Sequence, residues 1–142
     1  MNNKGFSLVE LLAVIIIIGI VAIIVVPSVT QYIDNASNTA YESYERSMSD
    51  AAKSRIIECQ TDFSLNCNLR LPYKMSGTGS ETRMDLSTLI SEGYIDSMKD
   101  PNSNDYCDSS QSYVKITLER ENSGEYIYSA CLVCGDYKTE GC

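Results

Sequence analysis

The sequence contains no histidine, and basic residues are scarce, with 11 Lys and Arg against 19 Asp and Glu. Without histidine the chain lacks the usual general base and the commonest metal ligand, which disfavours most enzyme classes. The net charge of −8 belongs to the C-terminal part, because the N-terminal apolar segment and its flank hold one Lys and one Glu. We interpret this acidity as a solvated surface that keeps a secreted domain soluble, and we expect it to repel nucleic acid.

Charge is also missing from a stretch near the N-terminus, where an unbroken apolar run extends from Leu11 to Val26 and stops at Pro27. A helix over residues 6–26 would be about 31 Å long, enough to span a bilayer. No small-x-small cleavage site follows the run, so it does not match an ordinary secretory signal. Lys4 precedes it and the next basic residue is Arg46. The positive-inside rule therefore predicts a cytoplasmic N-terminus and an exported C-terminal part.

Glu10 places a carboxylate at the start of this apolar segment. A charge near hydrocarbon costs on the order of a few kcal/mol unless it is paired or close to the interface. One interpretation is that Glu10 lies where the helix macrodipole and the lipid headgroups tolerate it. The other is a functional ion pair, and the residues taken alone leave both open.

The segment Lys4-Gly5-Phe6-Ser7-Leu8-Val9-Glu10-Leu11-Leu12, followed by the apolar run, resembles the prepilin signature of type IV pilins and of secretion or competence pseudopilins. The resemblance implies that a prepilin peptidase cleaves after Gly5 and methylates the new amine of Phe6. It also implies that Glu10 pairs with the amine of an adjacent subunit during assembly. Physical chemistry agrees, because cleavage removes Lys4 and creates an amine within about one helical turn of this carboxylate.

Gly19 and Pro27 fall where the resemblance expects residues that soften the helix. Proline removes a backbone donor and clashes with the preceding turn, and glycine offers no side chain for packing. We therefore predict that the helix kinks or locally melts at these two positions. The alternative is that Pro27 simply ends the membrane segment.

Beyond Pro27 the apolar residues recur every three or four positions, which predicts one stripe of an amphipathic helix. The stripe comprises Val29, Ile33, Ala36, Ala40, Tyr44, Met48, Ala52 and Ile56. A single helix from residue 6 to about residue 59 would be roughly 80 Å long. The expected organisation is a leader (1–5), a transmembrane and assembly helix (6–26), its amphipathic continuation (27–58) and a head (59–142).

The head pattern predicts a short helix and a hairpin. Asp85 and Gly93 are the expected N-cap and terminator of a helix over Leu86–Glu92. Strands are expected over Ser112–Arg120, with Val114, Ile116 and Leu118 on one face, and over Glu125–Val133. The predicted fold class is therefore α+β, with a long helix packed on a small antiparallel sheet.

Six cysteines follow the apolar segment, and their even number indicates a disulfide-braced domain in an oxidising compartment. They are Cys59, Cys67, Cys107, Cys131, Cys134 and Cys142. Fifteen pairings are possible; Cys59 with Cys67 is the favoured local pair, and Cys142 is expected to tie the C-terminus to the sheet. Two alternatives stay open: a zinc or thiol site built on Cys131-x-x-Cys134, and calcium in the loop from Asp100 to Asp108.

These observations predict a structural subunit rather than an enzyme, with no metal and no cofactor. The resemblance implies a type IV pilin that inserts into the membrane, is processed by prepilin peptidase, and joins other copies of itself, through the pilus assembly machinery, in a filament at the cell surface. A pseudopilin of a type II secretion or competence system is the alternative. A membrane-anchored thiol or zinc protein is a second one.

Overall fold

The computed structural model describes residues 7–61, 80–119 and 125–142. The elements in chain order are α1 (Leu8–Thr61), β1 (Glu81–Asp85), α2 (Leu86–Ser91), β2 (Tyr113–Leu118), β3 (Tyr126–Cys131), β4 (Val133–Cys134) and β5 (Tyr137–Lys138). They form two compact units, Met1–Asn38 and Thr39–Cys142, and α1 contributes to both. The predicted α+β fold class is confirmed, with a long helix, a small antiparallel sheet and disulfide bonds.

Helix α1 is 54 residues long and contains both Gly19 and Pro27. It does not end at Pro27, and two hydroxyls near the proline bond to backbone carbonyls of the helix. Thr30 Oγ1 donates to the Pro27 carbonyl (3.0 Å), and Ser28 Oγ donates to the Ile24 carbonyl (3.4 Å). The kink at Gly19 and Pro27 stays a prediction.

The first unit has no core of its own within the described residues. Its large apolar side chains from Leu8 to Val26 are 47–79% exposed. Val29, Ile33 and Ala36 are exposed as well. Within the predicted amphipathic stripe these three positions are therefore exposed, and partial burial begins at Ala40, farther along α1.

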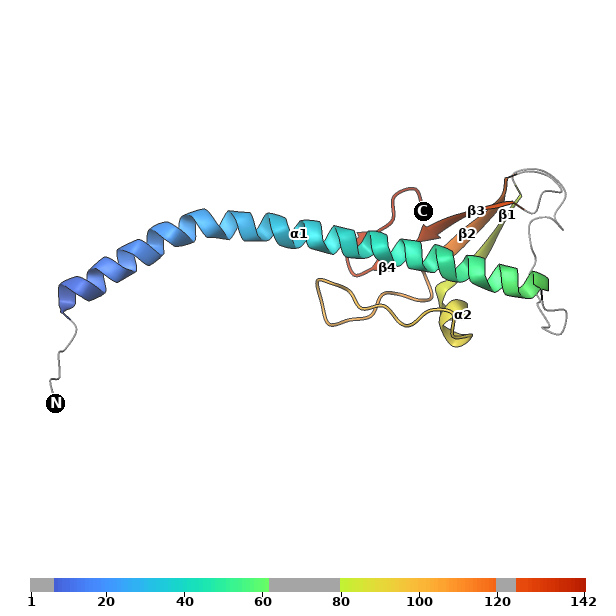
Figure 1. Ribbon diagram of the computed structural model, residues 1–142, viewed down its shortest axis with the longest axis horizontal. Helices are drawn as coiled ribbons and strands as arrows, with labels where there is room; N and C mark the ends of the chain where they lie inside the picture. Colours follow the sequence, from blue (N-terminus) through green and yellow to red (C-terminus); the bar gives the residue numbers. More distant parts are fainter. Residues whose placement is uncertain (1–6, 62–79, 120–124) are drawn as a thin grey trace. The chain divides into compact units, whose positions relative to one another are not determined.

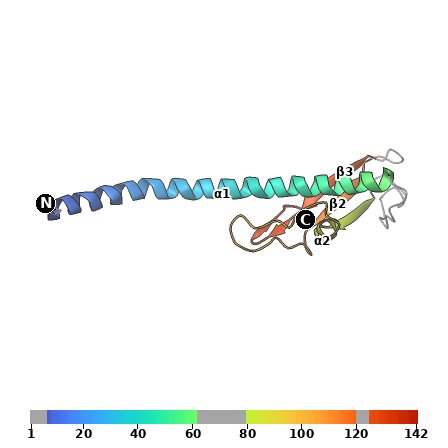
Figure 2. The same ribbon diagram turned by 60° about the horizontal axis from the view of Figure 1, so that its bottom comes forward.

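The second unit is built on a three-stranded antiparallel sheet in the order β1-β2-β3 (Figure 1). Its central strand buries Val114 and Ile116 completely, as the alternation predicts, and Leu118 is only 2% exposed. The same core contains Met48, Ala52 and Ile56 from α1. Both views show the sheet beside the C-terminal part of α1 (Figures 1 and 2).

Helix α2 lies within the predicted range, but its N-terminus is satisfied differently from the expectation. Asp85 occupies the N-cap position without a side-chain hydrogen bond. The amides of Leu86 and Ser87 instead donate to the carbonyls of Ser112 (2.9 Å) and Ser109 (3.0 Å). Gly93, with φ of +80°, follows the C-cap as predicted. The loop before β2 thus replaces the side-chain cap.

The predicted hairpin is present as β2 and β3, paired antiparallel from Tyr113 opposite Cys131 to Leu118 opposite Tyr126. Its expected turn, residues 122–124, lies outside the described residues. Strand β1, which pairs with β2, and the β4–β5 hairpin were not predicted. Gly135 and Asp136 form the two-residue loop of that hairpin, and the φ of +58° at Gly135 explains the glycine there.

Candidate functional site

The start of α1 is held by a reciprocal pair of side-chain hydrogen bonds. The hydroxyl of Ser7 accepts from the amide of Val9 (3.3 Å), and the Glu10 carboxylate accepts from the amide of Ser7 (3.0 Å). The first intrahelical bond runs from the Leu11 amide to the Ser7 carbonyl (3.2 Å). The sequence Ser-x-x-Glu therefore forms a capping box, with Ser7 as the N-cap residue. Gly5 and Phe6 lie outside the described residues, so cleavage and methylation stay predictions.

Glu10 is the first charged side chain of α1, and the next one along the helix is Asp34. Between them lies the segment that makes α1 long and apolar enough to cross a membrane. None of the most apolar part of that segment is buried inside the described protein. Residues 8–26 of the helix cover about 28 Å, close to the thickness of a bilayer's hydrocarbon core. A helix of these dimensions would place Ser7 and Glu10 together at one edge of the bilayer.

Residues 1–26 match the family described as the prokaryotic N-terminal methylation motif. The chain therefore carries the class III signal peptide of type IV pilins and pseudopilins. This motif points to a family of structural subunits rather than enzymes, and it implies processing by prepilin peptidase. No curated protein and no solved structure matches the chain. The properties of the head therefore rest on its own structure.

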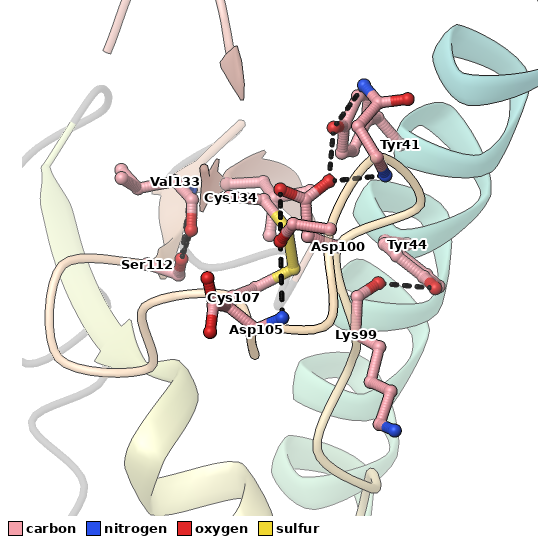
Figure 3. The surroundings of a disulfide bond; sticks show 12 residues. Tyr41, Tyr44, Lys99, Asp100, Asp105, Cys107, Ser112, Val133 and Cys134 are labelled. Carbon is pink, nitrogen blue, oxygen red and sulfur yellow. Dashed lines mark hydrogen bonds between the residues drawn. A yellow bond between two sulfur atoms is a disulfide. The ribbon is translucent and has the colours of Figure 1, made fainter. Parts of the chain in front are cut away.

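Two disulfides close the C-terminal part of the head. Cys107 bonds to Cys134 (Figure 3). Cys131 at the end of β3 bonds to Cys142, which is the last residue. The two bonds are interleaved in sequence, since Cys131 lies inside the loop that Cys107 and Cys134 close. Cys142 thus ties the C-terminus to the sheet.

Cys59 near the end of α1 is also disulfide-bonded. Its expected partner Cys67 lies outside the described residues, so that pairing stays a prediction. In the described part of the chain no cysteine is free. The alternative of a zinc or thiol site loses its chemical basis, because Cys131 and Cys134 belong to two different disulfides.

The loop considered for calcium uses its acidic side chains to hold its own turns. Asp100, only 7% exposed, accepts hydrogen bonds from the Tyr41 hydroxyl (2.7 Å), the Asn102 amide (2.9 Å) and Ser103 Oγ (3.2 Å). Asp108 accepts from the amides of Ser110 and Gln111. The bonds from the Asn102, Ser110 and Gln111 amides are ordinary local Asx bonds that hold turns. Over the described ranges no group of three acidic or cysteine side chains could hold a metal ion.

The bond between Tyr41 and Asp100 joins α1 to this loop (Figure 3). The Asn102 amide and the Tyr41 hydroxyl lower the pKa of Asp100, because both donate to its carboxylate. Burial, followed by the Asp100 carboxylate, raises the pKa of Tyr41 to about 12. The ring of Tyr41 stacks on Tyr137 with centroids 4.1 Å apart, and the Tyr137 hydroxyl donates to Glu45 (2.8 Å).

Sequence reasoning missed Tyr41, although a signal for it exists. Tyr41 lies seven residues before the fully buried Met48, so both fall on one face of a helix. The predicted stripe instead passed through Ala40 and Tyr44, which are only partly buried. Because Tyr41 is large and carries a hydroxyl, it combines core packing with the bond to Asp100.

Proposed function

We propose that the chain is a structural subunit of a type IV pilus, which polymerises through α1 into an extracellular filament. The observation that carries the proposal is the methylation motif at residues 1–26. The apolar segment of this motif forms the N-terminal part of α1, and its large side chains are exposed. An apolar helix of this length needs lipid or other protein to cover it. Lipid would cover it before assembly, and the helices of neighbouring copies would cover it in the filament.

Processing supplies the charge that assembly needs. Prepilin peptidase would cut between Gly5 and Phe6 and methylate the Phe6 amine, which removes Lys4 from the mature subunit. Glu10 would then pair with the amine of a neighbouring copy, so that neither charge stays unpaired in an apolar filament core. The kink at Gly19 and Pro27 belongs to the same proposal, as the place where α1 adapts to its neighbours.

The head supports a location outside the cytoplasm, with the N-terminus cytoplasmic until the subunit leaves the membrane. Its two described disulfides require an oxidising compartment. Its acidic surface and its braced C-terminus suit a domain exposed on the outside of a fibre, which favours a pilin over a pseudopilin. Adhesion, motility and DNA uptake are the activities that such a fibre serves.

Electron microscopy of cells that carry a labelled head tests this proposal. Long labelled surface fibres are expected, and they should disappear when the gene is deleted. Mature subunits should begin at Phe6 and carry one added methyl group, as measured by intact mass. If the processed subunit is abundant but no fibres are seen at the surface, the result would indicate a pseudopilin. A retained Met1 would contradict the processing step.

Glu10→Ala tests the assembly contact. The variant should remain in the membrane as a stable, processed subunit and form no filaments. Asp34→Ala removes the next carboxylate along the same helix and serves as the matched control, which should assemble normally. Normal filament yield from Glu10→Ala would contradict the charge-pair argument.

A further inference from the structure

Ser7 holds the side chain that the proposed assembly contact uses. Its amide donates to Oε2 of Glu10 (3.0 Å), and its hydroxyl accepts from the amide of Val9 (3.3 Å). Together the two bonds hold the first turn of α1 in place. We infer that Ser7 is a positioning residue, which presents the Glu10 carboxylate to the amine of an incoming second copy of this chain. The inference rests on the proposed function and adds a residue to it.

The hydrogen bond from the Ser7 amide still allows the Glu10 carboxylate to pair with a cation. The box uses Oε2 alone, and the described residues give Oε1 no hydrogen bond. A backbone amide is also a neutral donor, so it orients the carboxylate without cancelling its charge. With respect to the described residues, the second oxygen is therefore available for a charge-assisted bond to an amine, which is stronger than a bond between neutral groups.

Covalent geometry directs the carboxylate toward the end of the chain that cleavage creates. Glu10 extends back past the first turn of α1 to the Ser7 amide, whose nitrogen is three covalent bonds from the Phe6 nitrogen and so lies within about 4 Å of it whatever the backbone torsions. The acidic group and the new amine are thereby kept at the same end of the helix. When two copies lie side by side at the same depth in a membrane, the Glu10 carboxylate of one copy and the new amine of the other would lie at the same depth.

The surroundings of the helix start strengthen the case for this role. The first amides of any helix lack intrahelical partners, and in hydrocarbon such unpaired amides are costly. The capping box supplies partners for Ser7 and Val9 at the edge of the apolar segment. A glutamate side chain held in one rotamer also loses less entropy when it binds, so the ordered carboxylate favours association.

The experiment uses the full-length chain in its own cells, with Ser7→Ala, Ser7→Thr and Glu10→Gln. Filament yield is normalised to the amount of processed subunit, so that an effect on cleavage is measured separately. Ser7→Ala keeps the amide that donates to Glu10 but removes the hydroxyl that fixes the first turn, so it should lower the yield about fivefold, the usual effect of removing an N-cap hydroxyl. Ser7→Thr keeps the hydroxyl and should restore normal yield. Ser47→Ala, in the same helix but about ten turns beyond Glu10, removes an exposed serine hydroxyl that donates to the Ser43 carbonyl (2.9 Å); it is the matched control and should not change the yield.

Two further measurements separate positioning of Glu10 from a merely structural cap. Glu10→Gln keeps the capping box, because glutamine also accepts the Ser7 amide, but it removes the charge. In micelles of the processed subunit, exchange of the Ser7 amide should stay slow in Glu10→Gln and become fast in Glu10→Ala, although neither variant assembles. Glu10→Asp keeps the charge, but its side chain is one methylene shorter and should not reach the Ser7 amide. If Ser7 acts through Glu10, Ser7→Ala should cause no further loss of filament yield in that background.

The outcomes separate the positioning role of Ser7 from the proposed pilus function. Normal yield from Ser7→Ala, or an equal fivefold loss in the Glu10→Asp background, would overturn the positioning role and leave the proposed function intact. Absence of filaments from the unmodified chain would overturn the proposed function, while amide exchange would still report whether the capping box forms.

Discussion

Replacing Gly135 by alanine should destabilise the head far more than a substitution at an equivalent glycine. Gly135 has a φ of +58°, and a Cβ at this position would lie 2.2 Å from Oδ2 of Asp100. The carboxylate would have to retreat by about 1 Å or more to restore a normal contact. It is not free to do so, because Tyr41, Asn102 and Ser103 all donate to it.

The magnitude follows from two contributions. The left-handed backbone costs alanine about 1 kcal/mol. Displacing the Asp100 carboxylate from the Tyr41 hydroxyl removes a buried hydrogen bond to a charged group, worth about 2 kcal/mol. We therefore expect Gly135→Ala to lower the free energy of unfolding by about 3 kcal/mol. Gly93→Ala provides the matched control, since its φ is +80° and nothing lies within 4 Å of the added Cβ. That variant should lose only about 1 kcal/mol.

A fragment that begins at Thr30 lacks the apolar segment and retains the head with all six cysteines, so we expect it to be soluble and folded. Its urea unfolding measures both variants on the same scale. The difference of about 2 kcal/mol should appear as a Tm shift of roughly 10 °C in thermal scans. In an Asp100→Ala background the clash is absent, and Gly135→Ala should then cost no more than Gly93→Ala. Equal losses from the two glycine variants in the wild-type background would refute the contact with Asp100.

Three further predictions concern the same fragment. Stability should fall as the pH drops below about 4, because the lowered pKa of Asp100 contributes stability above its unfolded value and loses it on protonation; Asp100→Asn should flatten this acid limb of a pH titration followed by circular dichroism. Stability should also fall between pH 10 and pH 12, since the pKa values of Tyr41 and Tyr137 are both raised to about 12 and the folded state disfavours their ionised forms; in a difference absorbance titration against Tyr41→Phe, ionisation of Tyr41 by pH 10 without unfolding would contradict this. Reduction should lower the Tm sharply, because the loop closed by Cys107 and Cys134, 27 residues apart, is worth about 3.5 kcal/mol by the chain-entropy estimate; thiol titration under denaturing conditions should find no free thiol before reduction and six after it.

Periodicity is sufficient to predict the large elements from the sequence. The central strand alternates strictly, so its residues alone assign Val114 and Ile116 to the core. The long helix follows from an apolar run joined to a three-to-four spacing. These signals succeed because burial on one face of an element imposes its period on the residues.

The short elements were not predicted because their sequences do not indicate which segments they contact in the fold. Strand β1 contains Glu81, Arg83 and Asp85, and only Met84 is buried, so its pairing with β2 has little hydrophobic signature. The N-terminus of α2 was assigned a side-chain cap, while a distant carbonyl, that of Ser112, satisfies it. Contacts of this kind depend on the tertiary structure, and no local pattern encodes them.

At the N-terminus, by contrast, the sequence alone identifies the family motif, but it did not lead to the local hydrogen bonds. The motif at residues 1–26 is recognisable from its residues alone. The capping box of Ser7 and Glu10 was not predicted, although Ser-x-x-Glu before an apolar run is its known pattern. The charge of Glu10 is the more conspicuous property, and its carboxylate has a second role as a hydrogen-bond acceptor for the backbone.

The interleaved disulfides determine how far the head could be drawn out under tension. A chain pulled through residues 107–142 would pass from Cys107 directly to Cys134, back three residues to Cys131, and directly to Cys142. The 27-residue loop alone would otherwise release about 90 Å of contour length. In the proposed fibre, shear would therefore lengthen this part of each subunit very little, even after its sheet had separated. The covalent connectivity makes the C-terminal part of the head nearly inextensible without requiring it to be mechanically strong.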